Sequence, residues 1–155
     1  MCVSFFFIYN GDSMNEKYMN IALKEAKKAF KYDDVPVGCI IVKNNKIISK
    51  AFNKKENKKD AVKHAEIEAI SKACKKLKTW HLEECILYTT MEPCMMCSGA
   101  IIQSRIGHVC YAIKNDSFGM SEYIKKYNKN VIIEDNVLNE KSLELIQLFF
   151  KKKRM

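Results

Sequence analysis

Two short motifs constrain the fold of this chain more than any other feature of its sequence. The first is HAE at residues 64–66, and the second is PCMMC at residues 93–97. Each motif lies where the residue pattern predicts the start of a helix, and the second follows an apolar, strand-like run. Cys94 and Cys97 are three positions apart on a helix, so both sulfur atoms leave the same face. A fold that uses the two motifs together must bring two helix starts to one point.

One imidazole and two thiols form a set of zinc ligands. The helix dipole lowers the pKa of a thiol in the first turn, which favours the thiolate that a metal needs. Three protein ligands leave the fourth tetrahedral position open for water, which is typical of catalytic zinc, whereas a structural site is normally closed by a fourth ligand. The sequence therefore predicts one zinc ion per chain, held by His64, Cys94 and Cys97.

Glu66 is the residue that would move protons at such a site. It lies two positions from His64, and residues at that spacing do not face each other within a helix. The pair can converge only if the metal lies beyond the N-terminal end of the helix. Glu66 could then take a proton from water and deliver it to a leaving amine. A lone CxxC pair could be redox-active or half of a structural zinc site, but H-x-E followed by P-C-x-x-C is the signature of zinc nucleobase deaminases.

The rest of the sequence alternates between helical and strand-like patterns. Apolar residues at helical spacing predict helices over residues 19–30 and 64–77. Runs rich in β-branched residues predict a hairpin at 39–49 and strands at 85–90, 109–113 and 131–134. A further helix is expected from Pro93, a loop at 53–63, and a last amphipathic helix capped by Asn139. Alternating elements of this kind imply an α/β domain in which helices cover a sheet.

The length of 155 residues suits a single compact domain. We expect this domain to span residues 14–155, preceded by an N-terminal extension, residues 1–13, that could be disordered. An apolar stretch at residues 2–9 is too short to span a bilayer, and no Lys or Arg precedes it as in a signal peptide. A cleaved targeting segment is the alternative interpretation of this extension.

Charge and cysteine content indicate the partner and the compartment. The formal net charge is +9, which favours contact with a polyanion such as nucleic acid or an anionic membrane surface. The seven cysteines are odd in number and irregularly spaced, which argues against a disulfide framework. A reducing, cytoplasmic location without membrane insertion fits this pattern best.

The segments VPVGCIIV, HAEIEAI, LYTTMEPCMMCSGAIIQSRIGHVCYA and FFKKKR resemble the bacterial tRNA-specific adenosine deaminases of the cytidine-deaminase-like superfamily. The resemblance runs from about Asp34 to the basic C-terminal end, and CSGAIIQSRIG at residues 97–107 is its most discriminating part. It implies a three-layer α/β/α fold with a mixed five-stranded sheet, and a homodimer. It also implies conversion of adenosine to inosine at the wobble position of a tRNA anticodon.

The resemblance also assigns substrate contacts. His64, Cys94 and Cys97 match the family's zinc ligands, and Glu66 matches its proton carrier. Asn53 matches the asparagine that touches the flipped nucleotide. Asn115, followed by Asp116, stands where the family often has an acidic residue in a loop beside the substrate. The wall of the substrate pocket corresponds to Val35, Pro36 and Gly38.

Positive charge near this pocket would contact the anticodon stem-loop. We expect the basic end of the chain, residues 151–154, to bind RNA together with Arg105 and Lys114, and binding to weaken with salt. Two other functions stay open. A deaminase of a free base or nucleoside, such as guanine, cytosine or cytidine, would use the same metal chemistry. A non-catalytic zinc-binding subunit of an RNA-binding complex would not need Glu66. The functional dimer could also be a heterodimer.

Deleting residues 1–13 tests the expected domain boundary. Since the resemblance begins later in the chain, the truncated protein should keep nearly all of its thermal stability and activity. Thermal denaturation and a deamination assay on both proteins would measure this. Loss of folding in the truncated protein would show that residues 5–7 belong to the hydrophobic core.

Overall fold

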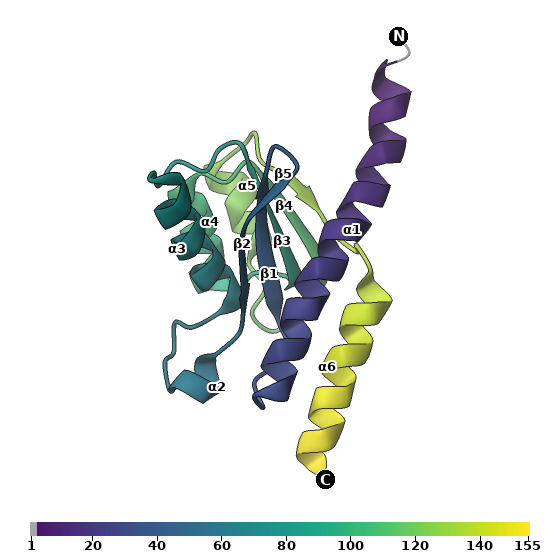
Figure 1. Ribbon diagram of the computed structural model, residues 1–155, viewed down its shortest axis with the longest axis vertical. Coiled ribbons are helices and arrows are strands. Elements are labelled where there is room, and N and C mark those ends of the chain that lie inside the picture. Colours follow the sequence, from purple (N-terminus) through teal and green to yellow (C-terminus); the bar gives the residue numbers. More distant parts are fainter. Residues whose placement is uncertain (1–2) are drawn as a thin grey trace.

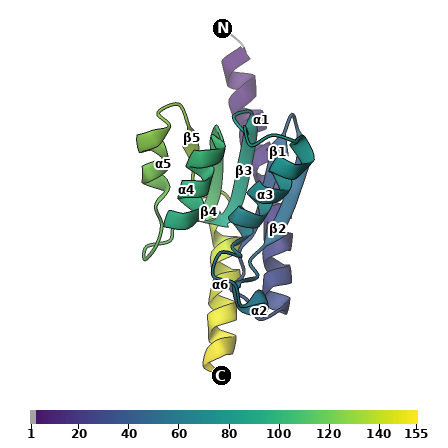
Figure 2. The ribbon, with the colours of Figure 1, turned by 90° about the vertical axis from the view of Figure 1, so that its left-hand side faces the viewer.

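A central sheet covered by helices on both faces forms the protein (Figure 1). The computed structural model describes the backbone of residues 3–155 and the side chains from residue 13 onward. Helices α1 and α6 lie on one face, and α3, α4 and α5 lie on the other (Figures 1 and 2). The helices are α1 (Val3–Lys31), α2 (Lys55–Lys58), α3 (Ala65–Leu77), α4 (Met95–Ser104), α5 (Ser121–Tyr127) and α6 (Asn139–Arg154). The strands are β1 (Gly38–Lys43), β2 (Lys46–Phe52), β3 (Cys85–Met91), β4 (His108–Ile113) and β5 (Ile132–Glu134).

The sheet has five strands in the order β2-β1-β3-β4-β5 and is mixed. Strand β1 pairs antiparallel with β2 and with β3. The pairs β3–β4 and β4–β5 are parallel. The expected three-layer α/β/α architecture with a mixed five-stranded sheet is therefore confirmed. Strand β1 lies inside the sheet with helices over both faces, which explains why its sequence is a continuous apolar run instead of an alternating one.

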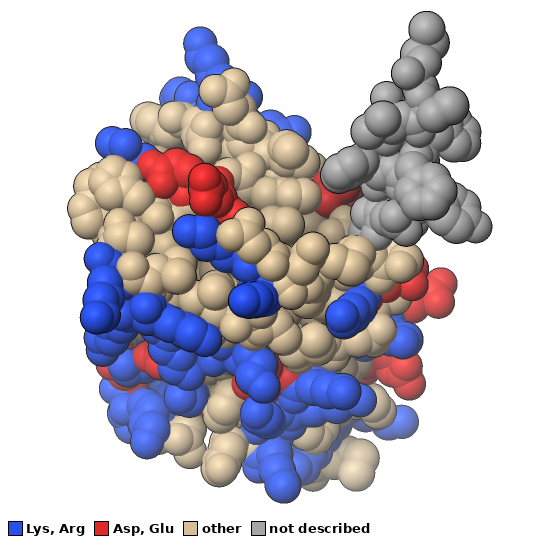
Figure 3. Space-filling view, turned by 45° about the horizontal axis from the view of Figure 1, so that its top comes forward, with Lys and Arg blue, Asp and Glu red and all other residues tan. Residues whose placement is uncertain are grey.

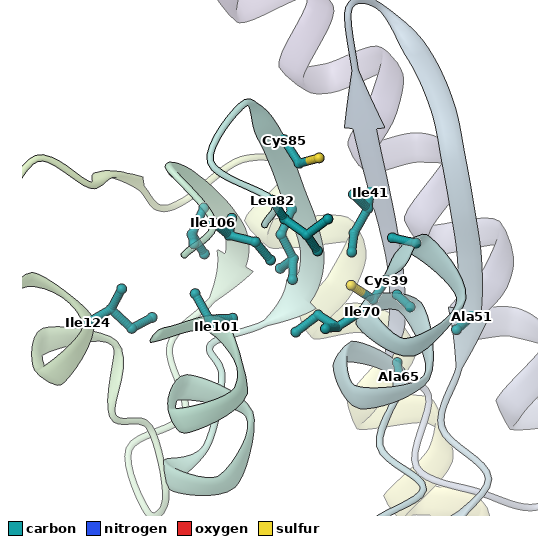
Figure 4. Packing of buried hydrophobic residues seen from close by; sticks show 14 of the residues in the cluster. Cys39, Ile41, Ala51, Ala65, Ile70, Leu82, Cys85, Ile101, Ile106 and Ile124 are labelled. Atoms are coloured by element: carbon teal, nitrogen blue, oxygen red, sulfur yellow. The ribbon is translucent and has the colours of Figure 1, made fainter. Parts of the chain in front are cut away.

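Two apolar cores form on opposite faces of the sheet. On one face Ile41 of β1 packs in a cluster with Ile70 of α3, Ile101 of α4 and Ile124 of α5 (Figure 4). On the other face strand residues such as Ile40, Val42 and Tyr88 pack against Met19 and Ala22 of α1. The alternation along β1 therefore assigns neighbouring residues to different cores. The first core fixes the starts of α3 and α4, where both sequence motifs lie.

Helix α1 is longer than expected. It begins at Val3 and has 29 residues, whereas the periodicity indicates a helix only from residue 19. The structure describes side chains only from residue 13 onward. The expected boundary between an N-terminal extension, residues 1–13, and the domain therefore stays a prediction. Within residues 3–155 we find no helix with the length and hydropathy needed to cross a bilayer.

Four local features differ from the sequence-based expectations. The segment 53–63 contains the short helix α2, and α5 was not expected because seven residues give too few apolar repeats to reveal a helix. The helix expected from Pro93 begins two residues later, with Cys94 as its N-cap. Asn139 does not cap α6, because it is the first helical residue and its side-chain amide donates a hydrogen bond to the carbonyl of Ala112.

The only tryptophan lies at the end of the molecule opposite the two motifs. Trp80 follows the C-terminal end of α3 and is 53% exposed. Its ring stacks on His81 with centroids 3.8 Å apart, and the guanidinium of Arg105 lies 5.1 Å from its centroid. Helix α3 separates this cluster from His64 by about 20 Å, its length at 1.5 Å per residue.

Gly38 is required by the packing of β1 against α1. A Cβ atom at this position would lie 2.0 Å from the carbonyl oxygen of Ala22 and 2.5 Å from the backbone nitrogen of Ala26. The substitution Gly38→Ala must therefore push α1 away from the sheet. We expect a loss of about 1–3 kcal/mol in the free energy of unfolding, measured by urea denaturation.

Gly99→Ala is the matched control for this substitution. Gly99 lies within α4, and a Cβ there would meet no atom within 4 Å. Alanine in a helix interior is favoured over glycine by about 0.5–1 kcal/mol, so this variant should be slightly more stable. Equal stabilities of the two variants would contradict the close contact between β1 and α1.

Candidate functional site

The side chains of His64, Cys94 and Cys97 converge at the starts of α3 and α4. His64 is the N-cap of α3 and Cys94 the N-cap of α4, both with extended backbone, while Cys97 lies in the first turn of α4. The Nδ1 atom of His64 lies 3.6 Å from the sulfur of Cys94 and 3.6 Å from that of Cys97. All three potential ligand atoms lie within 4.8 Å of one another.

These distances fit a tetrahedral zinc ion. Ligands at the usual zinc–nitrogen and zinc–sulfur bond lengths are about 3.6 Å apart across a tetrahedral edge. The observed separations of 3.6 Å therefore match without any rearrangement of the side chains. The pKa of Cys94 is well below that of a free thiol, because hydrogen bonds from Cys97 and His64 stabilise its thiolate. An imidazole and two sulfur atoms are also the donor types that zinc prefers.

Glu66 lies beside the three potential ligands and is 4% exposed. Its Oε1 accepts a hydrogen bond of 3.0 Å from the hydroxyl of Thr89, and its Oε2 lies 3.5 Å from the sulfur of Cys97. The pair His64 and Glu66 can converge because His64 is the N-cap and is not yet helical. Burial raises the pKa of the Glu66 carboxyl, although the charges and hydrogen bonds around it act in the opposite direction.

A cavity of about 430 Å³ opens beside these residues. It has the size of a small-molecule site. Of the substrate residues expected from the sequence, Val35, Asn53 and Asn115 line it, as do His64, Glu66 and Cys94. The amide of Asn53 is oriented from both ends: Nδ2 donates to the carbonyl of Val35, and Oδ1 accepts from the backbone N–H of Lys55.

Pro36 and Gly38 do not line this cavity. Both are buried, and Gly38 donates its backbone N–H to the hydroxyl of Thr90 while its α-carbon contacts α1. Their position indicates that Pro36 and Gly38 are packing residues beneath Val35. A direct contact between either residue and a substrate stays a prediction.

The 115–121 loop, as named here, follows β4 and ends at Ser121, the first residue of α5. Asn115 organises its turn, since Oδ1 accepts the N–H of Phe118 and its carbonyl accepts the N–H of Gly119. Phe118 and Ser117 line the cavity, and Phe118 is 72% exposed. Glu92 contacts Asn115 and Ser121 of this segment, and Thr89 contacts Glu66. The position of Glu92 next to the PCMMC motif is a signal in the sequence that could have identified it as a functional residue. Thr89 has no such signal, because its sequence pattern indicates only a buried strand.

A second group of metal-binding residue types lies on the other face of the sheet. His108, Cys110 and Glu134 approach one another there. The Nε2 atom of His108 is 2.7 Å from Oε2 of Glu134. That is a hydrogen-bond distance, and two ligands of one tetrahedral ion would lie about 3.4 Å apart. Asn15 also donates to the same carboxylate oxygen, so this group is a hydrogen-bonded cluster.

Comparisons with known proteins agree with this geometry. A family model described as MafB19-like deaminase matches residues 13–154. The tRNA-specific adenosine deaminase of Aquifex aeolicus is 43% identical over 149 residues, which cover 90% of this chain and 95% of that protein. The tRNA-specific adenosine deaminase of Bacillus subtilis is 36% identical over 148 residues, which cover 92% of each chain.

A solved structure supports the same relationship. It comes from a study of A-to-I editing by tRNA:A34 deaminases at the wobble position of transfer RNA. It superposes with a TM-score of 0.77 at 30% identity, and the match covers 83% of this chain and 98% of the other. The similarity therefore extends over most of the fold of both chains.

Proposed function

The chain belongs to the tRNA-specific adenosine deaminases, and we propose that it converts adenosine to inosine at the wobble position, nucleotide 34, of a tRNA anticodon with one zinc ion per chain. The observation that carries the proposal is the convergence of three potential zinc ligands beside Glu66. The Nδ1 atom of His64 lies 3.6 Å from the sulfur of Cys94 and 3.6 Å from that of Cys97, and Glu66 contacts Cys97. The 43% identity to a tRNA-specific adenosine deaminase over most of both chains supports the substrate.

The reaction replaces the amine on carbon 6 of adenine with an oxygen from water and releases ammonia. A zinc ion held by His64, Cys94 and Cys97 would polarise that water. We assign the proton transfers to Glu66, which would take a proton from the water and deliver it to the departing amine. Its burial and raised pKa support this role, because a carboxyl of raised pKa can hold the proton between the two transfers. The hydroxyl of Thr89 would keep the carboxylate oriented.

We assign recognition of the target base to Asn53. One hydrogen of its Nδ2 and one lone pair of its Oδ1 are used by Val35 and Lys55. A side-chain amide has two N–H donors and two acceptor positions, so one of each remains for a base in the cavity. Val35 and Asn115 would contact the same nucleotide from the sides of the cavity.

An RNA substrate would also contact the surface around the cavity. Carbon 6 is inaccessible in a stacked duplex, so the enzyme needs a base that is already unpaired, as in an anticodon loop. Residues 151–154 are exposed at the end of α6, and Phe150 of the same helix lines the cavity. On the face drawn in Figure 3, lysine and arginine side chains outnumber acidic ones over the lower half.

The two other basic residues expected to contact RNA differ in position. Lys114 follows β4 and directly precedes Asn115, which lines the cavity. Arg105 follows the C-terminal end of α4, about 15 Å from Cys94 by the length of that helix, beside Trp80. Arg105 is therefore not part of the proposed RNA-binding surface.

A homodimer in the cytoplasm is our proposal for the assembly and the location. The family resemblance supports the dimer, and the exposure of Met95 and Phe118 near the cavity, at 71% and 72%, gives it an apolar surface. The free thiols that the site requires favour a reducing compartment. Multi-angle light scattering would report a mass near twice 18.0 kDa.

The variant Glu66→Gln tests the assignment of the proton carrier. It should retain about one zinc per chain, measured by metal analysis, because none of the three ligands changes. Turnover should fall by about 10²–10⁴-fold or more, since Gln cannot accept and release the proton. A zinc-loaded variant that kept its activity would remove Glu66 from the mechanism.

The substrate is tested with a stem-loop carrying adenosine at the wobble position. Inosine formation should be efficient there and slight with free adenosine, cytidine, cytosine or guanine. If a free base or nucleoside were deaminated equally well, the alternative of a free-base deaminase would replace the tRNA assignment. A zinc-loaded protein with no turnover on any of these substrates would support the non-catalytic alternative.

Charge neutralisation at the end of α6 tests the RNA-binding surface. We expect Lys151→Gln, Lys152→Gln and Arg154→Gln together to raise the KM for the stem-loop and to flatten its dependence on salt. Lys153 is left unchanged because it pairs with Asp33 at 2.5 Å and joins α6 to α1. The matched control is Lys75→Gln, Lys76→Gln and Lys78→Gln at the opposite end of α3. If the two triple variants changed the KM and its salt dependence equally, RNA binding would depend on the net charge of the protein and not on the end of α6.

A further inference from the structure

The loop of residues 115–121 forms one side of the cavity in which the proposed substrate would lie. Asn115, Ser117 and Phe118 line the cavity, and the loop connects β4 to α5. The exposed ring of Phe118 offers a surface on which a base could stack. The position of this loop relative to the three zinc-ligand residues therefore determines the shape of the site.

Glu92 binds both ends of this loop through its side chain. Its Oε1 accepts the backbone N–H of Asn115 at 3.2 Å. Its Oε2 accepts the backbone N–H of Ser121 at 3.2 Å and the hydroxyl of the same residue at 2.5 Å. Hydrogen bonds to an ionised carboxylate are about twice as strong as those between neutral groups. One carboxylate thus connects Asn115, near the end of β4, with Ser121, the first residue of α5.

The backbone around Glu92 adds contacts to the same loop. The carbonyl of Pro93 accepts the N–H of Met120 at 2.9 Å, and Cys94 forms an isolated β-bridge with Gly119. Gly119 approaches the carboxylate so closely that a Cβ atom there would lie 2.4 Å from Oε1 of Glu92. The loop is therefore attached to the residues that directly precede the zinc ligand Cys94.

We propose that Glu92 is a positioning residue, which holds the 115–121 loop against the start of α4 so that the loop and the metal ligands keep a fixed relative position. The proposal rests on the deaminase function proposed above. Without the carboxylate, two backbone N–H groups lose their acceptor and the loop gains freedom. The substrate would then have to order the loop on binding, which raises KM. The zinc ligands and Glu66 would be unaffected.

A graded series of variants tests this role. Ser121→Ala removes one hydrogen bond, Glu92→Gln leaves a single acceptor oxygen, and Glu92→Ala removes both acceptors. Amide hydrogen exchange at Asn115 and Ser121 should accelerate in that order, by about tenfold or more in Glu92→Gln. The KM for the stem-loop should rise in the same order, with zinc content unchanged and kcat changed much less than KM. Glu122→Gln is the matched control, because it makes the same charge change on a neighbouring exposed side chain.

Three results would overturn the proposal. One is equal amide exchange in Glu92→Gln and Glu122→Gln, and another is a fall in kcat with unchanged KM, which would place Glu92 in the chemical step. Loss of zinc from a folded Glu92→Gln would assign it to the metal site instead. If Glu92→Ala does not fold, the results for Ser121→Ala and Glu92→Gln still test the positioning role of Glu92. The exchange and zinc measurements need no substrate, so they remain decisive if the wild-type protein acts on a free base instead of RNA.

Discussion

The convergence of three ligand atoms from two helices is the constraint on which the rest of this structure depends. Strand β2 is antiparallel to β1, and β1 is antiparallel to β3, so β2 and β3 run in the same direction. The chain therefore leaves both strands at one edge of the sheet, and the helices that follow, α3 and α4, begin side by side on one face. Right-handed crossover connections make this the ordinary outcome of the topology. The three potential metal ligands lie at these two helix starts, where backbone N–H groups favour thiolates.

Two glutamates of this chain show how surroundings assign different roles to one residue type. Burial raises the pKa of Glu66, which has one hydroxyl donor in Thr89. Burial also acts to raise the pKa of Glu134, but hydrogen bonds from His108, Cys110 and Asn15 outweigh it and leave that pKa below the usual value. The lowered pKa of Glu134 favours its ionised form within a hydrogen-bonded cluster, whereas the raised pKa of Glu66 suits it to gaining and losing a proton.

The sequence predicts the chemistry of this protein better than it predicts the structure of the loops. Short motifs determine the ligand positions because spacing and helix starts are local properties, and the apolar runs reveal the strands because they are buried on both faces. The contacts of Glu92 could not be foreseen, since they join residues 23 and 29 positions apart. The family pattern does not distinguish a cavity wall from the layer beneath it, so it could not show that Pro36 and Gly38 pack beneath Val35. The charge of Arg105 is visible in the sequence, but its position at the end of α4 away from Cys94 is not.

The position of Trp80 has a practical consequence for spectroscopy. As the only indole in the chain, it dominates any fluorescence signal that is excited selectively over tyrosine. Its ring stacks on His81, so its surroundings change when this end of the molecule unfolds. The cavity begins about 20 Å away, at the other end of α3. Intrinsic emission will therefore report the unfolding of this end of the molecule, while the arrival of a nucleotide will need an extrinsic dye on the opposite edge of the sheet to be seen.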